Sequence, residues 1–594
     1  MMRFACVVAV ALCGGADALA ADYKPAESTL YTRWAKDVDP AGPLPEHPRP
    51  QMVRESYMNL NGLWDYAIRP KEDAKPAAFD GKILVPFAVE SALSGVKKPV
   101  GGENRLWYRR SFGIPHDADG KRTLLHFGGV DWHAIVYVNG KQVGEHKGGY
   151  DAFTFDITDA LEGDTSPEGE QPQELVVSVW DPTNAGPQPR GKQVNNPHGI
   201  WYTPVTGIWQ TVWLEVVPKV HIESLQIVPD VDAGEVRVGA TQVGAAKPCV
   251  VWAKVFDNGK LIAEGKAAGQ PVALKIPDAR LWSPDSPFLY DLEVGFGDGD
   301  CVKSYFGMRK IEMKKDDAGI NRIWLNGKTL FQIGPLDQGW WPDGLYTAAT
   351  DDALRHDVEM TKRLGFNMAR KHVKVEPCRW YYHCDNLGLL VWQDMPNGNK
   401  GETFETEWKH VIDMLRNHPS IVMWVPFNEG WGQYDTERIA KWTKEYDPTR
   451  LVNEASGWHN RGFGDVYDIH KYPGPAMPAL DENRAAVLGE FGGLGLPVKG
   501  HLWWDKKNWG YRNFEDGESL QAAYEDLIEK LHPMIGKGLT AAVYTQTSDC
   551  EGEVNGLMTY DRQVVKFDAD KLAALHAELH KPHSQNGDGR PEAK

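Results

Sequence analysis

Cysteine, long basic runs and long apolar runs are all scarce in this sequence. It has seven cysteines among 594 residues, and two of them, Cys6 and Cys13, lie in an N-terminal leader. The remaining cysteines are odd in number and match no zinc spacing, which excludes a complete disulfide framework and a zinc-finger protein. The formal net charge is −17 and no basic run is long, so the electrostatic footprint of a nucleic-acid-binding protein is missing.

Residues 1–20 are typical of a signal peptide. Arg3 precedes an apolar stretch from Phe4 to Leu12, and Ala18-Leu19-Ala20 has the small-x-small pattern of a cleavage site. The apolar stretch is too short to span a bilayer, and no later stretch reads as a membrane helix. Lipid attachment at Cys13 is the alternative, but the bulky Leu12 before it fits poorly. We therefore expect an exported protein, periplasmic or secreted, without a membrane span.

The region from 51 to 218 reads as a series of short strands, preceded by an N-terminal extension at 21–50. Five runs alternate apolar and polar residues or are rich in β-branched and aromatic ones: Leu63–Ile68, Leu106–Phe112, Ala134–Val138, Leu175–Trp180 and Gln210–Val216. Asn139-Gly140 follows one of them and is a strong hairpin signal, because both residues tolerate positive φ. This pattern predicts an all-β sandwich.

A second β region covers 219–313. It contains the run Val250–Phe256 and the turn Asn258-Gly259, and its length suits a small immunoglobulin-like sandwich. A third hairpin signal, Asn326-Gly327, leads into the next domain.

From 314 to 594 the pattern changes to apolar strands that alternate with helices, followed by a C-terminal tail. Helical periodicity is clearest at Asp352–Leu364, Phe404–Arg416 and Leu520–Leu531. The eight candidate strands are Leu330–Ile333, Asn367–Arg370, Leu389–Gln393, Ile421–Val425, Leu451–Glu454, Val466–Ile469, Ala486–Gly489 and Thr540–Thr545. Eight such β-α units predict a closed barrel of parallel strands. No repeat of 20 to 50 residues is visible, which excludes a solenoid.

Two glutamates stand where strands of this barrel stop. Glu429 comes just after the apolar run Ile421–Phe427, and Glu490 follows Ala486–Gly489. Strand ends meet on one face of such a barrel, so two carboxylates there can flank one bond. Glycosidic bond cleavage needs that pair: one carboxyl protonates the leaving oxygen while the second attacks the anomeric carbon or activates water. For either glutamate alone, an exposed residue on the barrel rim is the alternative.

Motifs in two of the predicted domains resemble glycoside hydrolase family 2. They are Gly149-Tyr-Asp-Ala-Phe153 and Gly207-Ile-Trp-Gln210 in the first sandwich, and His418-Pro-Ser-Ile-Val-Met-Trp-Val-Pro-Phe-Asn-Glu429 and Gly489-Glu-Phe-Gly-Gly493 in the barrel. The resemblance covers nearly all of the chain after the leader. It implies a multidomain fold with an N-terminal jelly roll that resembles sugar-binding modules, an immunoglobulin-like sandwich and a catalytic (β/α)8 TIM barrel.

The resemblance also implies a reaction and roles for individual residues. The family hydrolyses glycosides with retention of configuration, and its motifs place the acid/base at Glu429 and the nucleophile at Glu490. A retaining pair should be about 5 to 5.5 Å apart. Asn428 corresponds to the asparagine that hydrogen-bonds the sugar 2-hydroxyl, and Tyr472 to the tyrosine that donates to the nucleophile. Arg370, at the end of the second strand, could keep the nucleophile ionised through its fixed positive charge.

Further candidates lie near other strand ends. His372 and His470 could bind sugar hydroxyls, although a lone histidine is as often structural. Asp337 could accept hydrogen bonds from hydroxyls, or it could be a loop carboxylate in solvent. Five tryptophans in predicted barrel loops could form a stacking platform for a sugar, of which we expect one or two to touch substrate: Trp340, Trp341, Trp431, Trp503 and Trp504. The segment 182–199 is either a loop that reaches the barrel mouth or a solvated linker.

Specificity is only weakly determined. The segment Val391-Trp-Gln-Asp-Met-Pro396 looks nearer to β-mannosidases than to the metal-binding stretch of galactosidases, so we expect no metal and no organic cofactor. The leading expectation is an exo-acting β-galactosidase for an oligosaccharide or polysaccharide-derived substrate, with either a monomer or a homo-oligomer compatible with the sequence. β-Mannosidase, β-glucuronidase and arabinosidase activity are the alternatives within the family. A non-catalytic carbohydrate-binding protein is the alternative of another class.

Overall fold

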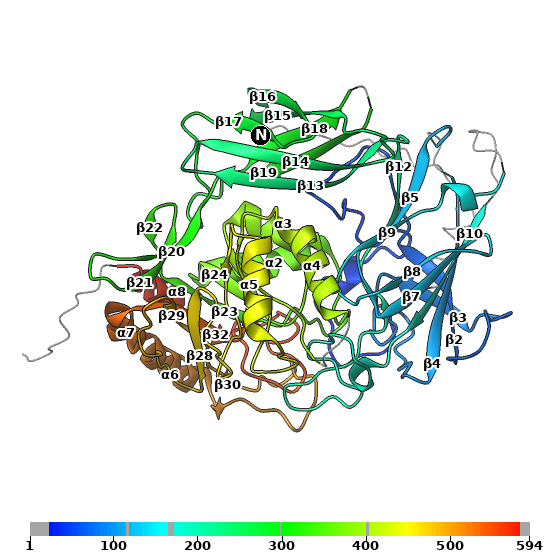
Figure 1. Ribbon diagram of the computed structural model, residues 1–594. Helices are drawn as coiled ribbons and strands as arrows, with labels where there is room; N and C mark the ends of the chain where they lie inside the picture. Colours follow the sequence, from blue (N-terminus) through cyan, green and yellow to red (C-terminus); the bar gives the residue numbers. More distant parts are fainter. Residues whose placement is uncertain (1–22, 115–117, 164–171, 298, 399–402, 582–594) are drawn as a thin grey trace, which may run out of the picture.

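Two β-sandwiches and a barrel ringed by helices make up the molecule (Figure 1). The computed structural model describes residues 23–114, 118–163, 172–297, 299–398 and 403–581. The predicted signal peptide, at 1–20, and the end of the C-terminal tail lie outside these ranges. Among the described residues, no helix is both long and apolar enough to cross a membrane. The multidomain β-sandwich and TIM-barrel architecture expected from the sequence is confirmed.

The first sandwich, blue to cyan in Figure 1, pairs a four-stranded sheet of order β1-β12-β5-β9 with a six-stranded sheet of order β3-β2-β4-β10-β7-β8, and β6 pairs with β11. Its strands are β1 (Tyr57–Asn59), β2 (Gly62–Pro70), β3 (Gly81–Val85), β4 (Asn104–Phe112), β5 (Arg122–Phe127), β6 (Val130–Asp131), β7 (His133–Val138), β8 (Lys141–Lys147), β9 (Phe153–Asp156), β10 (Gln173–Trp180), β11 (Gly207–Ile208) and β12 (Val212–Val217). Short 3₁₀ turns are η1 (Ala35–Asp37), η2 (Thr158–Ala160) and η3 (Thr183–Ala185). Asn139 and Gly140 join β7 to β8 with φ of 48° and 76°, as their sequence predicts.

The second sandwich packs a sheet of order β13-β14-β17 against one of order β16-β15-β18-β19. Its strands are β13 (His221–Asp230), β14 (Glu235–Val243), β15 (Val250–Asp257), β16 (Lys260–Ala268), β17 (Val272–Lys275), β18 (Tyr290–Phe296) and β19 (Cys301–Phe306). A small antiparallel sheet of β20 (Ile311–Lys315), β21 (Asn321–Leu325) and β22 (Lys328–Thr329) leads into the barrel. The buried Arg54 joins the two sandwiches, because its guanidinium binds both Glu215 and Asp300 at 2.6 Å.

The barrel is a nearly closed eight-stranded parallel sheet of order β27-β26-β25-β24-β23-β32-β29-β28. Barrel strands that follow one another in the chain are paired, except β27 and β28, which stand at the two ends of this order. Its strands are β23 (Gln332–Asp337), β24 (Met368–Lys371), β25 (Leu390–Asp394), β26 (Ile421–Val425), β27 (Leu451–Val452), β28 (Val466–Lys471), β29 (Ala485–Gly492) and β32 (Leu539–Thr545). The helices are α2 (Asp351–Arg363), α3 (Cys378–Leu387), α4 (Phe404–Leu415), α5 (Thr436–Tyr446), α6 (Gly517–Glu529), α7 (Leu531–Lys537) and α8 (Ala569–Glu578), and β30 (Leu494–Gly495) pairs with β31 (Arg512–Asn513) above β29.

All eight predicted barrel strands are present, with ends shifted by a few residues. Strand β29 runs on to Gly492, so Glu490 lies inside a strand instead of after it. Strand β23 ends at Asp337, and Arg370 is followed by one more strand residue. These strands are buried along their whole length, as parallel strands covered on both faces are. Continuous burial leaves no alternation in the sequence to mark where each strand ends.

The chain before the first sandwich packs on the barrel. The backbone N–H and the hydroxyl of Thr32 both donate to Asp343, at 2.8 Å and 2.6 Å, and Trp34 packs edge-on against Trp341. A loop of the first sandwich also reaches the barrel, because Pro189 and Gly398 form a β-bridge and the N–H of Gly191 donates to the carbonyl of Asn397 at 2.8 Å. The segment 182–199 is therefore not a solvated linker.

Candidate active site

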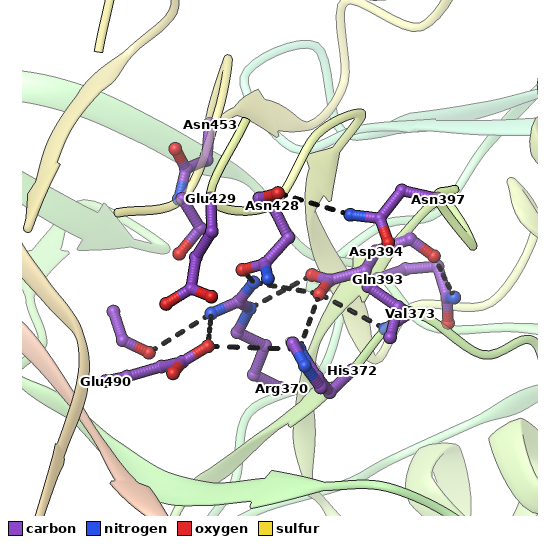
Figure 2. A network of polar contacts seen from close by, with 12 residues as sticks. Arg370, His372, Val373, Gln393, Asp394, Asn397, Asn428, Glu429, Asn453 and Glu490 are labelled. Atoms are coloured by element: carbon purple, nitrogen blue, oxygen red, sulfur yellow. Dashed lines mark hydrogen bonds and ion pairs between the residues drawn. The ribbon is translucent and has the colours of Figure 1, made fainter. Parts of the chain in front are cut away.

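Glu429 and Glu490 meet at the carboxyl ends of the barrel strands. One carboxylate oxygen of each, together with one ring nitrogen of His470, lies within 4.8 Å of the other two. Figure 2 shows the two carboxylates facing each other, Glu429 from the turn after β26 and Glu490 from β29. The predicted pair thus faces one small region, at a spacing that leaves room for one bond between them.

Glu490 is held by positive and hydrogen-bonding groups. The Arg370 guanidinium donates to Oε1 at 3.1 Å and the Tyr472 hydroxyl donates to Oε2 at 2.6 Å. Burial by itself would raise the pKa of Glu490, but the charges of His470, Arg370 and nearby groups outweigh it and lower the pKa to about 2. Glu490 is therefore ionised throughout the ordinary pH range.

His470 lies between the two carboxylates. Its Nδ1 is 2.8 Å from Oε1 of Glu429 and 3.4 Å from Oε2 of Glu490. Its Nε2 is 2.8 Å from the hydroxyl of Ser456, which donates to Asp468 at 2.6 Å. Burial opposes the charged ring, yet the neighbouring Glu490, Glu429 and Asp468 raise the pKa of His470 above its usual value. A protonated His470 can therefore donate a hydrogen bond to Glu429 and balance the negative charge of Glu490.

A strained backbone turn positions Glu429. Its φ is 49°, a left-handed conformation that side chains other than glycine seldom adopt. Backbone bonds fix the turn: the Glu429 N–H donates to the Ser456 carbonyl at 2.8 Å, and the Ser456 N–H donates to Phe427 at 2.9 Å. With 13% of its side chain exposed, Glu429 is the more accessible of the two glutamates, since Glu490 shows 6%. The turn therefore leaves the Glu429 carboxylate accessible to a ligand that enters from solvent.

Arg370 is the hub of the polar network in Figure 2. The side chain is fully buried on β24 and binds Asp394 through two hydrogen bonds of 3.0 Å and 2.9 Å. It also donates to Oδ1 of Asn428 at 2.7 Å. That bond fixes the amide of Asn428, whose buried Nδ2 has no hydrogen-bond partner among the described residues. One donor beside the glutamate pair is therefore left for a ligand.

His372 joins the same network from the turn after β24. Its Nδ1 is 3.1 Å from Oδ2 of Asp394 and 4.0 Å from Oε1 of Glu490. Burial, followed by the charge of Lys192, lowers the pKa of His372 well below its usual value. The ring is therefore neutral, in contrast to His470.

Two of the predicted ligand-binding residues lie apart from this cluster. Asp337 accepts a hydrogen bond from Lys371 at 2.8 Å and one from the Gly339 N–H, so its carboxylate is satisfied by the protein. Trp431 packs against Trp201 of the first sandwich, with ring centroids 4.8 Å apart. Their roles as sugar-binding residues stay predictions, and Trp431 is the better placed of the two because it is not fully buried.

The other tryptophans of the expected stacking platform pack inside the protein or against its loops. Trp340 and Trp341 are 2% and 1% exposed and belong to the hydrophobic core. Trp503 packs edge-on against Tyr560, and Trp504 covers Gly552. Burial leaves the rings of Trp340 and Trp341 without an open face for stacking. That one or two of the five tryptophans touch substrate stays a prediction, with Trp431, Trp503 and Trp504 as the remaining candidates.

The sequence reasoning did not single out several residues that organise the site. Asp394, at the end of β25, orients Arg370 and His372, while Ser456 and Asp468 position His470. Asp394 and Asp468 do have a signal in the sequence, since each is an acidic residue inside or at the end of a buried strand. Tyr511 also stacks on Tyr472 with ring centroids 3.6 Å apart, and that contact has no such signal.

Glu429, His470 and Glu490 are also the one trio of possible metal ligands found among the described residues. The raised pKa of His470 favours a ring that carries a proton at Nδ1, and a proton there competes with a metal ion. The arrangement thus suits proton transfer and attack by a carboxylate. The expectation that the chain uses no metal stays a prediction.

Three family models match the chain in the order of its domains. The glycosyl hydrolase 2 galactose-binding domain-like model matches residues 92–203, the model named glycosyl hydrolases family 2 matches 220–309, and the family 2 TIM barrel domain model matches 320–473. Together they cover more than half of the chain and all three of its structural bodies.

Known proteins with related sequences or folds agree with these models. A β-galactosidase of Thermoanaerobacter pseudethanolicus is 27% identical over 416 residues, which are 64% of this chain and 52% of that protein. The chain spans about half the length of the curated relatives it matches. Two solved β-glucuronidase structures share the fold. The one from an uncultured Clostridium species is 20% identical with a TM-score of 0.70, and the match covers 89% of this chain and 99% of that one. The one from Ruminococcus gnavus in complex with D-glucuronic acid is 18% identical with a TM-score of 0.70, and the match covers 90% of this chain and 100% of that one.

Proposed function

Because the chain belongs to glycosyl hydrolase family 2, we propose that it is a retaining exo-β-glycosidase with Glu490 as nucleophile and Glu429 as acid/base. The observation that carries this proposal is the approach of the two carboxylates to within 4.8 Å, on either side of a single site. Retaining enzymes have their carboxyl groups about 5 to 5.5 Å apart, whereas inverting ones need about 6.5 to 9.5 Å to admit a water. The observed spacing favours double displacement.

In the first step Glu490 attacks the anomeric carbon. Its lowered pKa keeps it ionised, and Arg370 and Tyr472 orient its two oxygens. As the new C–O bond forms, the glycosidic bond breaks and Glu429 gives its proton to the leaving oxygen. The free Nδ2 of Asn428 is placed to donate to a sugar hydroxyl, an interaction that strengthens as charge develops on the ring.

In the second step Glu429 acts as a base. It takes a proton from water, the hydroxide oxygen attacks the anomeric carbon, and the bond to Glu490 breaks. His470 supports both steps because its Nδ1 lies within hydrogen-bonding distance of Glu429, and a protonated ring balances the negative charge of either glutamate. Two inversions at the same carbon retain the configuration.

The proposal also names the sugar that is cleaved. We keep a β-galactoside as the first candidate because curated relatives at 23 to 27% identity are named β-galactosidases. A β-glucuronide is the second candidate, because two curated relatives at 30% and 29% identity are named putative β-glucuronidases. Exo action, export through residues 1–20 and assembly into a homo-oligomer rest on the sequence alone and are proposals of the same kind.

The direct test is hydrolysis of a panel of p-nitrophenyl β-glycosides, followed by proton NMR of the first product. We expect one pyranoside of the panel to be cleaved and the β-anomer of the free sugar to appear before mutarotation. Appearance of the α-anomer first would contradict the retaining mechanism. No cleavage of any β-glycoside would contradict the enzymatic function and favour a carbohydrate-binding protein.

Replacement of His470 by asparagine should shift the pH profile. In the wild-type protein the pKa of Glu490 is about 2, so loss of the nucleophile's charge does not limit the rate above pH 4. His470 supplies the largest favourable charge at Glu490, so a neutral amide raises the pKa of that carboxyl toward its ordinary value near 4.3. Because the nucleophile acts only above its pKa, the acid limb of kcat/KM should move to higher pH.

The matched control is His133→Asn, which removes a partly buried histidine of the first sandwich that pairs with Glu145 at 3.5 Å. Its pH profile should be that of the wild type. An unchanged acid limb in His470→Asn would show that His470 does not hold Glu490 ionised.

A further inference from the structure

Lys192 is brought to the barrel by a loop of the first sandwich that packs unusually close. Gly191 has φ of 57°, and a Cβ on it would lie 2.5 Å from the carbonyl oxygen of Val373, next to His372. Only glycine fits such an approach. The backbone carbonyl of Lys192 accepts a hydrogen bond from the Tyr202 N–H at 2.9 Å, which fixes the loop from its other side.

The side chain of Lys192 is largely buried, and its ammonium has no protein partner among the described residues. The residue is 5% exposed, and its Nζ lies over the ring of Tyr202 at 5.4 Å from the centroid. It makes no hydrogen bond or ion pair with any residue in the described part of the chain. A buried charge without a partner is costly, so such a group usually has a ligand. Lys192 lies near both His372 and Glu553, because the preceding Gly191 packs on Val373, next to His372, and the Tyr202 side chain contacts both Lys192 and Glu553.

Glu553 is a second buried polar group at the same end of the barrel. It is 2% exposed, and one carboxylate oxygen accepts a short hydrogen bond from the Tyr202 hydroxyl. The other oxygen has only a long contact of 3.5 Å with Asn555. Burial raises the pKa of Glu553 and the charge of Lys192 opposes this, yet the two do not form an ion pair.

A backbone bridge and two aromatic contacts connect Glu553 to the glutamate pair. Trp509 forms a β-bridge with Glu553, and its ring packs edge-on against Tyr511 with centroids 5.3 Å apart. Tyr511 stacks on Tyr472, which binds Glu490. Tyr511 is therefore linked to Glu490 through Tyr472 and to Glu553 through Trp509, and burial and the charges of these carboxylates raise the pKa of its phenol. Lys192 and Glu553 therefore border the region in which the sugar is bound.

We propose that Lys192 and Glu553 together bind hydroxyl groups of a neutral sugar and select it over a uronic acid. The inference rests on the proposed glycosidase function and names its substrate class. A hydroxyl can donate to Glu553 and accept from Lys192, so it satisfies both groups at once. A substrate carboxylate could pair with Lys192 only beside Glu553, Glu429 and Glu490, and like charges at such a site repel. The site therefore discriminates against the acid that the name β-glucuronidase implies.

The test compares p-nitrophenyl β-galactoside with p-nitrophenyl β-glucuronide, which differ at C6 and in the C4 configuration, and includes the β-glucoside to separate these two changes. Wild-type kcat/KM should be higher for one of the two neutral substrates than for the glucuronide by about 100-fold or more. Lys192→Met and Glu553→Gln should each lower kcat/KM for that neutral substrate by about 10- to 100-fold, the loss expected for a hydrogen bond to a charged group. Glu553→Gln should narrow the preference over the glucuronide because it removes the repulsion. Lys192→Met should keep that preference, because loss of a cation near the substrate carboxylate lowers kcat/KM for the glucuronide at least as much.

Controls separate a binding role from a folding role. Lys141→Met removes an exposed lysine of the same sandwich, 56% exposed in its side chain, and should leave all three rates unchanged. Removal of the 4- or 6-hydroxyl from the neutral substrate should lower kcat/KM less in the variant that lacks the side chain binding that hydroxyl than in the wild type. A general loss of folding would not produce this coupling. Thermal unfolding checks that each variant is folded.

Two results would overturn the proposal. The first is a wild-type preference for the glucuronide that Lys192→Met alone abolishes, since Lys192 would then bind the carboxylate. The second is an equal effect of both variants on every substrate. Calorimetric binding of free galactose, glucose and glucuronate to the wild-type chain gives a readout that does not depend on hydrolysis. Selective binding of a neutral sugar without turnover would therefore support the pair while the enzymatic function fails.

Discussion

Glu490→Ala should lower kcat by about 10⁴-fold or more, which corresponds to about 5.4 kcal/mol in the barrier at 1.36 kcal/mol per tenfold. Without the carboxylate no covalent bond forms at the anomeric carbon, and the positive charge that develops there loses its nearest counter-charge. Sugar binding should persist, because Arg370, Asn428 and Glu429 remain. The measurement is kcat on the best p-nitrophenyl substrate together with the dissociation constant of its free sugar.

Azide provides the positive control for this variant. The small anion can enter the space left by the carboxylate, attack the anomeric carbon and release the aglycone, so the product should be a glycosyl azide of inverted configuration. The comparison variant is Glu429→Gln, which should lose more rate on substrates with poor leaving groups than on activated aryl glycosides, since only the former need a proton. Full activity of Glu490→Ala, or rescue of Glu429→Gln with inversion, would reverse or remove the assigned roles.

Arg370→Met should destabilise the protein and inactivate it together. The guanidinium is fully buried and is the common partner of Asp394 and Glu490, so its loss removes the ion pair of Asp394 and leaves Glu490 with His470 as its nearest cation. Breaking a buried ion pair by removing one partner costs about 3 to 5 kcal/mol of folding free energy. We expect a clearly lower unfolding temperature and, in protein that is still folded, a fall in kcat of about 10²- to 10³-fold.

The control for Arg370 is Arg363→Met. Arg363 pairs with Asp570 at 2.6 Å, but both side chains are exposed, and surface pairs contribute about 0 to 1 kcal/mol. Unfolding temperature and kcat of this variant should be close to those of the wild type. Equal unfolding temperatures for the two variants would contradict the central position of Arg370 in the network.

The barrel and its two glutamates could be predicted from the sequence because both leave local signals. Each barrel strand is a run of apolar residues, and parallel strands gather their ends on one face whatever the details of packing. Hence Glu429 and Glu490 could be placed together without coordinates, with Arg370 beside them because it ends the second strand and Tyr472 beside them through the family resemblance. Helix α3 was missed, since its sequence from Cys378 is rich in aromatic residues with modest helix propensity and has no side-chain cap.

Other features depend on contacts that leave no trace along the chain. The loop that carries Lys192 lies beside Val373 only because the first sandwich packs on the barrel, which is a contact between separate domains. Composition also could not distinguish a tryptophan that stacks on a sugar from one in the core. The burial of Trp340 and Trp341 in the structure assigns these two to the core. Asp394 was visible in the sequence, but its importance comes from Arg370 and His372 converging on it in three dimensions.

The loop that carries Gly191 has a consequence for how such proteins diversify. Pro189 forms a β-bridge with Gly398, and the Thr203 N–H donates to the buried Glu551 at 2.8 Å, so the N-terminal sandwich is anchored to the rim of the barrel. It cannot be exchanged for an unrelated accessory module in the way that tethered binding domains are. New substrate preferences in this lineage would have to arise through paired changes on both sides of that contact.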